Sequence, residues 1–393
     1  MTMAAAMQSR TAEAPARSKA SRIAQVEIVT DLDAAEAVWR SFEEPGHLFT
    51  PYQRFDLLSP WQRLVGAREG ARPFVVIARD ADRNPLLLLP LSLRQGHGVR
   101  TACFMGGKHT TFNMGLWDTA CAAQTNAADL EALLAPLRQH LDVLALTQQP
   151  LRWHDQPNPF ALLPRQSAIN GCPQLVMEPG GPPASRISNS LRRRLKSKEK
   201  KLQALAGYRY HLATTDADIA RLLDWFFRVK PVRMAEQKLP NVFAEPGVEQ
   251  FVRSACLAPR GEGRVIDIHA LECDDEVIAI FAGVADGERF SMMFNTYTMS
   301  EHARYSPGLI LMRYIIDRYG ERGYRSLDLG IGSDEYKRMF CKDDEEIFDS
   351  FVPLTSRGTL AAMAMSSLSR GKRLVKQNQM LFDLARRLRQ AFG

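Results

Sequence analysis

The sequence predicts a mixed α/β fold made of two similar units in tandem. Apolar runs of strand length alternate with helical patterns over residues 25–179, and a similar order of elements returns over residues 207–355. Gly180-Gly181-Pro182-Pro183 between them is typical of a linker. A chain of 393 residues is long enough for two or three domains. We therefore expect two α/β domains.

Composition limits the classes of function. The formal net charge of +7 suits phosphate-bearing ligands or anionic surfaces. The six cysteines form no C-x-x-C pair and the eight histidines are scattered, so no metal site is predicted and free thiols in the cytoplasm are expected. No apolar run approaches the roughly 20 residues that span a bilayer.

Three segments outside the two units have distinctive compositions. Residues 1–24 are rich in Ala, Ser and Arg, which predicts a disordered tail. Residues 180–206 hold the linker and a basic helix, whose charged face is either simply solvated or recognises CoA phosphates, an anionic acceptor or RNA. Residues 356–393 predict a basic amphipathic helix that docks on the protein or lies on an anionic membrane surface.

Several boundaries within the units can be predicted. Residues 105–109, which contain Gly106-Gly107, form either a plain turn or a ligand loop. A helix is expected from Asp216 through Val229, followed by a polar loop at residues 233–238 that could recognise an acceptor. Residues 347–352 are expected to be the last strand of the second unit.

The stretch from Arg289 to Phe340 organises the second unit. A buried strand ends near Tyr297, and Ser306-Pro307-Gly308 predicts a helix start with Ser306 as N-cap and Pro307 at the first helical position. Helix starts expose backbone N–H groups and a positive dipole, so a phosphate can bind there, although many such starts bind nothing.

A second strand follows this helix. Residues 326–330 alternate, so Leu327 and Leu329 face one side and Asp328 faces the other, towards an expected cleft. Gly330-Ile331-Gly332 then allows a tight turn before another helix start near Tyr336 and Lys337.

The residues at these strand ends, helix starts and turns resemble the GNAT acyltransferase superfamily. They resemble more closely its cellulose-biosynthesis branch of CelD/BcsL-type acetyltransferases. The matching positions are Tyr305 to Gly308, Leu309 to Tyr319, Arg322 to Tyr324, Asp328 to Gly330, Tyr336-Lys337 and Phe340. The resemblance implies two tandem GNAT-like domains, acetyl-CoA or another acyl-CoA as co-substrate, and no metal. It is looser over the rest of residues 26–354.

The resemblance also implies a binding site. The strand ending near Tyr297 would splay from its neighbour, and the pantetheine arm would lie in the gap. The implied donor-site residues are Asn295, Tyr297, Arg304, Tyr305, Ser306, Gly308 and Lys337. Pro307 departs from the GNAT pattern, because it stands where the first glycine of the phosphate loop belongs and has no N–H to offer.

The leading hypothesis is direct acyl transfer from acyl-CoA to an amine or hydroxyl acceptor, such as a sugar. Asp328 is the candidate base or acceptor-orienting residue, or alternatively a cap for the turn that follows it, and Tyr336 is the candidate acid for the leaving thiolate. One alternative is a Fem-type transferase that uses aminoacyl-tRNA. Another is a catalytically degenerate GNAT scaffold at the membrane.

Overall fold

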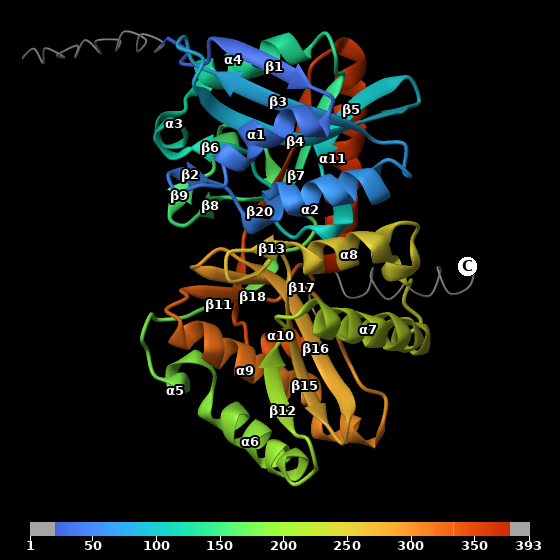
Figure 1. Ribbon diagram of the computed structural model, residues 1–393. Helices are drawn as coiled ribbons and strands as arrows, with labels where there is room; N and C mark the ends of the chain where they lie inside the picture. Colours follow the sequence, from blue (N-terminus) through green and yellow to red (C-terminus); the bar gives the residue numbers. More distant parts are fainter. Residues whose placement is uncertain (1–19, 333, 378–393) are drawn as a thin grey trace, which may run out of the picture.

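The computed structural model describes residues 20–332 and 334–377, which form two mixed α/β units stacked end to end (Figure 1). Residues 1–19 of the expected N-terminal tail and residues 378–393 of the expected C-terminal helix lie outside the described residues. The last residues of the expected tail pack on the first unit, because Ile23 is buried and Arg22 forms an ion pair with Asp129 at 2.7 Å.

The first sheet lies in the upper unit of Figure 1. Its strands, in spatial order, are β1 (Gln25–Val29), β3 (Arg72–Arg79), β4 (Pro85–Gly96), β5 (Val99–Phe104), β7 (Val143–Pro150), β20 (Ile347–Pro353) and β10 (Gln166–Ser167). Two short strands extend it through β4, namely β6 (Leu116–Asp118) and β2 (His47–Leu48). Helices of this unit are α1 (Leu32–Ser41), α2 (Phe55–Trp61), α3 (Thr119–Gln124), α4 (Ala127–Leu137) and α11 (Ser356–Gln377).

The second sheet lies in the lower unit. Its order is β12 (Arg209–Leu212), β15 (Asp267–Cys273), β16 (Glu276–Ala285), β17 (Arg289–Tyr297), β18 (Ser326–Asp328), β11 (Cys172–Val176) and β19 (Asp343–Glu345). Its helices are α5 (Pro183–Arg186), α6 (Asn189–Gln203), α7 (Asp216–Glu236), α8 (Val248–Leu257), α9 (Pro307–Glu321) and α10 (Glu335–Arg338).

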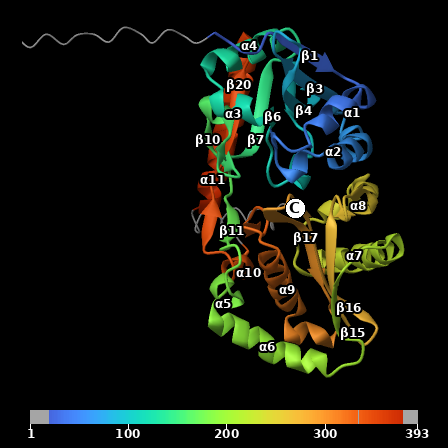
Figure 2. The same cartoon turned by 60° about the vertical axis from the view of Figure 1, so that its left-hand side comes forward.

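Each sheet contains a strand from the other half of the sequence. β20 lies between β7 and β10 in the first sheet, and β11 lies between β18 and β19 in the second (Figure 2). The expectation that residues 347–352 complete the second unit is therefore wrong. The alternating pattern of β20 identifies a strand but does not identify its partner.

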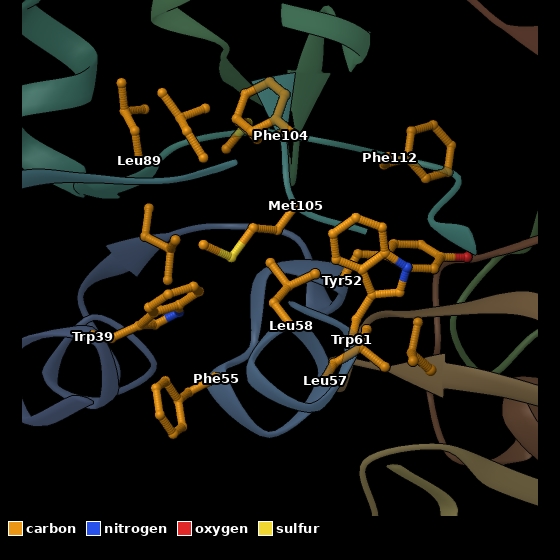
Figure 3. Packing of buried hydrophobic residues seen from close by; sticks show 14 of the residues in the cluster. Trp39, Tyr52, Phe55, Leu57, Leu58, Trp61, Leu89, Phe104, Met105 and Phe112 are labelled. Carbon is orange, nitrogen blue, oxygen red and sulfur yellow. The ribbon is translucent and has the colours of Figure 1, made fainter. Parts of the chain in front are cut away.

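The two units share one hydrophobic core. It joins the first sheet and α2 to residues of α7 and α8, such as Phe226 and Phe251. Figure 3 shows part of it, with Trp61 and Leu58 of α2 packed near Met105. The units are therefore joined by buried apolar surface as well as by exchanged strands, which favours one fixed arrangement.

Helix α7 is longer than the sequence predicts. It continues past Val229 to Glu236 although Pro231 lies inside it. Its N-terminal turns are anchored by buried residues such as Leu222 and Phe226, which hold the helix through the proline. Arg233 and Glu236 consequently lie on a helix rather than in the expected loop.

Candidate functional site

Strands β17 and β18 separate in the middle of the second sheet. They pair in parallel only from Arg289–Ser326 to Ser291–Asp328, and β17 then continues to Tyr297 without β18, paired only with β16 on its other edge. The chain leaves β18 through Gly330, whose φ of 71° is readily adopted by glycine. The splayed strands expected from the resemblance are thus present.

A cavity of about 600 Å³ occupies this opening. Residues 292–297 of β17 and residues 329–331 after β18 form part of its wall, and α7 contributes Lys230 and Arg233. Residues 108–111 of the first unit line it too, so the Gly106-Gly107 segment leads into a cavity wall. The cavity therefore lies where the two units meet.

Asn295 is hydrogen-bonded to two other residues that line the cavity. Its Nδ2 donates to the hydroxyl oxygen of Tyr336 at 3.2 Å, and its backbone oxygen accepts from Lys230 Nζ at 3.0 Å. Burial raises the pKa of Tyr336, so the phenol keeps its proton. Burial, with a smaller contribution from Arg233, lowers the pKa of Lys230 to about 8. A phenol and an amine that deprotonates near neutral pH thus share one cavity.

His109 lines the cavity from the first unit. Its Nδ1 accepts from Trp61 Nε1 at 3.0 Å, so the proton of the neutral ring lies on Nε2. Burial and neighbouring Lys108 lower its pKa. His109 is therefore a neutral donor at physiological pH.

Lys337 also lines the cavity, but its ammonium group is already bound. Lys337 Nζ donates to the backbone oxygens of Gly330 and Ile331 at 3.1 and 2.9 Å. The side chain is almost completely buried. Lys337 thus fixes the turn that opens the sheet and does not extend freely towards a phosphate.

The start of α9 lies at the outer end of β17. Tyr297 lines the cavity, and its ring lies 3.5 Å from the position of a Cβ built on Gly308. Ser306 is the N-cap in a left-handed conformation with φ 58°, and its side chain makes no capping hydrogen bond. Instead, Lys198 Nζ of α6 donates to Ser306 Oγ at 2.7 Å.

Arg304 and Tyr305 complete this region. The exposed Arg304 guanidinium bonds to Glu301 at 3.1 Å and lies 4.9 Å from the ring centre of half-buried Tyr305. Lys201 Nζ lies 6.0 Å from the same ring. The predicted donor-site residues therefore form two adjoining groups, one in the cavity and one at the start of α9.

Helix α6 supplies positive charge beside the start of α9. Leu191, Leu195 and Leu202 are buried, as the helical spacing predicts. Its outward-facing cations are Arg193, Arg194, Lys196, Lys200 and Lys201. An anion at the start of α9 would meet Lys198 directly and the other cations at longer range.

Asp328 does not face the cavity. Its side chain is fully buried, and it accepts from Arg289 Nε at 2.9 Å and Ser291 Oγ at 2.5 Å. The Arg289 guanidinium lies against the adjoining rings of Phe112 and Trp153, with its centre 4.4 and 4.6 Å from theirs. The expected orientation of Asp328 into the cleft is wrong, because its polar face is occupied by this ion pair.

Comparison with family models identifies part of the chain. Residues 189–338 match the model described as an acetyltransferase (GNAT) domain. The matched segment runs from α6 to α10 and so includes the opening between β17 and β18 and the start of α9. The second unit is thus similar to GNAT acetyltransferase domains over this segment. No protein of curated function matches the sequence significantly.

Solved structures share the fold over most of the chain. A conserved protein of unknown function from Bacteroides thetaiotaomicron has a TM-score of 0.54 at 11% identity, and the match covers 84% of this chain and 100% of that one. FemX has a TM-score of 0.53 at 8% identity, over 83% of this chain and 97% of that one. L-PGS from Bacillus licheniformis has a TM-score of 0.50 at 11% identity, over 90% and 99%. At these identities the likeness concerns the fold alone.

Proposed function

We propose that the protein is an acyltransferase that binds acetyl-CoA or another acyl-CoA along β17. The observation that carries this proposal is the separation of β17 from β18, which leaves a cavity beside the part of β17 that has no β18 partner. Tyr297, at the end of that strand, lies beside Gly308 at the start of α9. A pantetheine arm would pair with the unpaired edge of β17, and the phosphates would lie at Ser306 and Gly308.

The charge at the start of α9 supports this arrangement. Pro307 offers no N–H, so an anion there receives fewer backbone hydrogen bonds than at an ordinary helix start. Lys198 lies within hydrogen-bonding distance of Ser306, and Arg304 is exposed nearby. In the proposed site these cations compensate for the missing N–H group.

The cavity contains groups suited to direct acyl transfer. The acceptor amine or hydroxyl attacks the thioester carbonyl, the C–S bond breaks, and the thiolate must gain a proton. We assign proton donation to the Tyr336 hydroxyl and proton removal from the acceptor to neutral Lys230. Lys230 replaces Asp328 as the proposed base because it lines the cavity and Asp328 does not.

Titration with acetyl-CoA tests donor binding. We expect micromolar affinity for the unchanged protein and a loss of at least tenfold in Gly308→Glu, because the carboxylate repels the phosphates. Gly371→Glu is the matched control, since Gly371 lies in α11 and a Cβ added there would have no atom within 4 Å. Absence of binding by the unchanged protein contradicts the proposal.

A Fem-type transferase with an aminoacyl-tRNA donor is the second candidate. It is favoured by the fold shared with FemX across both units and by the exposed cations of α6. Binding of tRNA that weakens steeply with salt, together with no binding of acetyl-CoA, would support this candidate over the first.

The acceptor is proposed from the resemblance to cellulose-biosynthesis acetyltransferases. Sugar hydroxyls and amino sugars are therefore the first acceptors to test, ahead of protein lysines and small amines. A role in polysaccharide or cell-envelope synthesis depends on that resemblance.

We also propose that α11 contacts an anionic membrane surface from the cytoplasmic side. Its outward face exposes Leu360, Met363 and Leu374 by 73%, 63% and 63%. Residues 356–377 contain no acidic residue, and their basic residues are Arg357, Arg370, Lys372, Arg373 and Lys376. An apolar face flanked by cations suits an interface with anionic lipid. Among residues 20–332 and 334–377, no helix has the length and apolar character needed to cross a bilayer.

A further inference from the structure

Four side chains with metal-binding atoms meet beside the turn between β15 and β16. Cys273 ends β15 and pairs with Glu276 at the start of β16, so their side chains share one face of the hairpin. Asp274 lies in the turn, and His302 approaches from η6 (Glu301–Tyr305). Ligand atoms of Cys273, Asp274 and His302 all lie within 4.8 Å of one another.

The imidazole of His302 is buried without a hydrogen bond. The residue is only 8% exposed, and its Nδ1 has no partner among the described residues. Its Nε2 lies 3.7 Å from Asp274 Oδ2 and 3.9 Å from Glu276 Oε2, which is too long for hydrogen bonds. Nε2 is the nitrogen that faces the two carboxylates, and it makes no hydrogen bond within the described residues, so it is available to a cation.

The carboxylates around His302 also lack cationic partners. Within the described residues, neither Asp274 nor Glu276 forms an ion pair with a lysine or arginine. Glu276 is nevertheless held in place, because its Oε1 accepts from the hydroxyl of Thr298 while its Oε2 faces His302. Two carboxylates without a lysine or arginine partner leave negative charge here that a divalent cation would balance.

We propose that Cys273, Asp274 and His302 bind one zinc ion, with the Glu276 carboxylate beside them. A thiolate with an imidazole favours zinc, whereas magnesium and calcium prefer oxygen ligands alone. Zinc–ligand bonds of about 2.0–2.3 Å in a tetrahedral site place the ligand atoms roughly 3.3–3.6 Å apart. His302 Nε2 and Asp274 Oδ2, which are 3.7 Å apart, need only a small contraction to reach this range, and the ligand atoms of Cys273, Asp274 and His302 all start within 4.8 Å of one another. The thiol gives its proton to solvent as the Zn–S bond forms.

A second group of similar composition shows the contrast. His211, Asp218 and Glu272 also lie within ligand distance of one another. There, however, Arg221 already bonds to both carboxylates, and His211 Nε2 bonds to Asp218 at 2.8 Å. Although His211 Nδ1 also lacks a partner, the two carboxylates of that group are paired with an arginine, whereas Asp274 and Glu276 form no ion pair with a lysine or arginine within the described residues.

The zinc ion would join two segments that are far apart in the sequence. η6 ends at Tyr305, immediately before Ser306 at the start of α9. A zinc ion held by the β15–β16 turn and by His302 would therefore restrain the segment that leads into α9. This restraint is expected whatever donor the protein uses.

Zinc titration of the full chain tests the site. The protein is treated with a chelator, dialysed and titrated with zinc chloride by calorimetry, then with cobalt(II) by absorbance. We expect one zinc per chain and a thiolate-to-cobalt charge-transfer band. Cys273→Ser and His302→Gln should each weaken zinc binding by about 100-fold or more. Cys103→Ser, a half-buried thiol of the first sheet, is the matched control and should bind zinc normally.

Three results would overturn the proposal. They are no stoichiometric zinc binding by the unchanged chain, a cobalt spectrum without the sulfur band, or unchanged zinc affinity in folded Cys273→Ser or His302→Gln. Asp274→Asn decides the matter if the buried substitutions prevent folding, because Asp274 is an exposed turn residue. It should keep the circular dichroism of the unchanged protein and weaken zinc binding at least tenfold, and unchanged affinity would also overturn the proposal.

Discussion

Asn295 and Tyr336 meet across the opening between β17 and β18, where Asn295 Nδ2 lies 3.2 Å from the Tyr336 hydroxyl. Asn295 lies on the free part of β17, and Tyr336 begins the short helix that follows the turn after β18. This contact places a protonated phenol in the wall of the cavity at the point where the two strands have separated.

Replacing Tyr336 with phenylalanine should slow acyl transfer while leaving donor binding intact. The ring still packs, but the hydroxyl that protonates the thiolate is lost. We expect kcat to fall about 100-fold or more, which is in the usual range for general acids, while the Kd for acetyl-CoA changes less than about threefold. Steady-state kinetics with a sugar or amino sugar that the unchanged protein acylates measures this. Tyr324→Phe is the control, and equal kcat in both variants contradicts the assignment.

Activity should rise with pH through about 8 if Lys230 is the base. Burial lowers the pKa of Lys230 to about 8, and only the neutral amine can take a proton from the acceptor. The neutral fraction grows as the pH passes that value, so kcat/KM increases and then levels off. In Lys230→Met, kcat/KM should be low at every pH and should not rise near pH 8.

The control for this profile is Lys238→Met, because Lys238 is exposed beyond the end of α7. This variant should show the same pH dependence of kcat/KM as the unchanged protein. Lys230→Arg should not restore activity, since a guanidinium remains charged throughout this range. If kcat/KM of Lys230→Met still rises with pH near 8, another group is the base.

Arg289→Met should destabilise the fold strongly. It leaves Asp328 buried without its cation and also removes the contact from Arg289 Nη1 to Glu345 at 2.6 Å. Breaking a buried ion pair costs about 3–5 kcal/mol of the free energy of unfolding. Arg338→Met removes an exposed pair with Asp344 and should cost less than about 1 kcal/mol. Urea unfolding of both variants tests the difference, and equal losses would contradict it.

Glutamate at Leu360, Met363 and Leu374 should weaken binding to anionic vesicles. The three substitutions place negative charge on the outward face of α11, and we expect at least a tenfold loss of affinity for phosphatidylglycerol-containing vesicles. Leu162→Glu is the matched control, because Leu162 is a leucine of similar exposure, 59%, outside α11. Co-sedimentation measures binding. No binding by the unchanged protein excludes this membrane contact.

Neither half of the chain should fold alone. Residues 20–179 lack β20, which leaves the edge of β7 unpaired, and residues 180–377 lack β11, which separates β18 from β19. We expect insoluble protein from each segment and soluble protein when both are produced together. Circular dichroism during heating tests this, with residues 20–377 as the control. Cooperative unfolding of an isolated half would show that the exchanged strands are dispensable.

The sequence predicts local elements better than their partners. The alternation around Leu327 and Leu329 indicates a strand with Asp328 on its polar side, and the structure confirms the strand. The ion-pair partner of Asp328 is Arg289, which belongs to a neighbouring strand and contacts two rings from the first unit. Such a partner depends on tertiary packing, which periodicity does not encode.

The same reason explains why the sequence does not single out Lys230. A lysine just before Pro231 has the sequence signature of a helix end at the surface, yet α7 continues and carries this side chain into the cavity. The start of α9 depends on local signals in Ser306 and Pro307, and its position is therefore predictable. The domain boundaries at residues 179 and 355 stay predictions. β11 precedes residue 179 but belongs to the second sheet, and β20 precedes residue 355 but belongs to the first.

The exchange of β20 has a consequence during synthesis on the ribosome. β7 and β20 are neighbours in the first sheet, but roughly 200 residues of chain separate them, which takes roughly 10–40 s to synthesise at 5–20 residues per second. During that interval the apolar edge of β7 has no permanent neighbour. The nascent chain therefore exposes an unpaired strand edge until β20 emerges, and chaperones or other chains can pair with that edge.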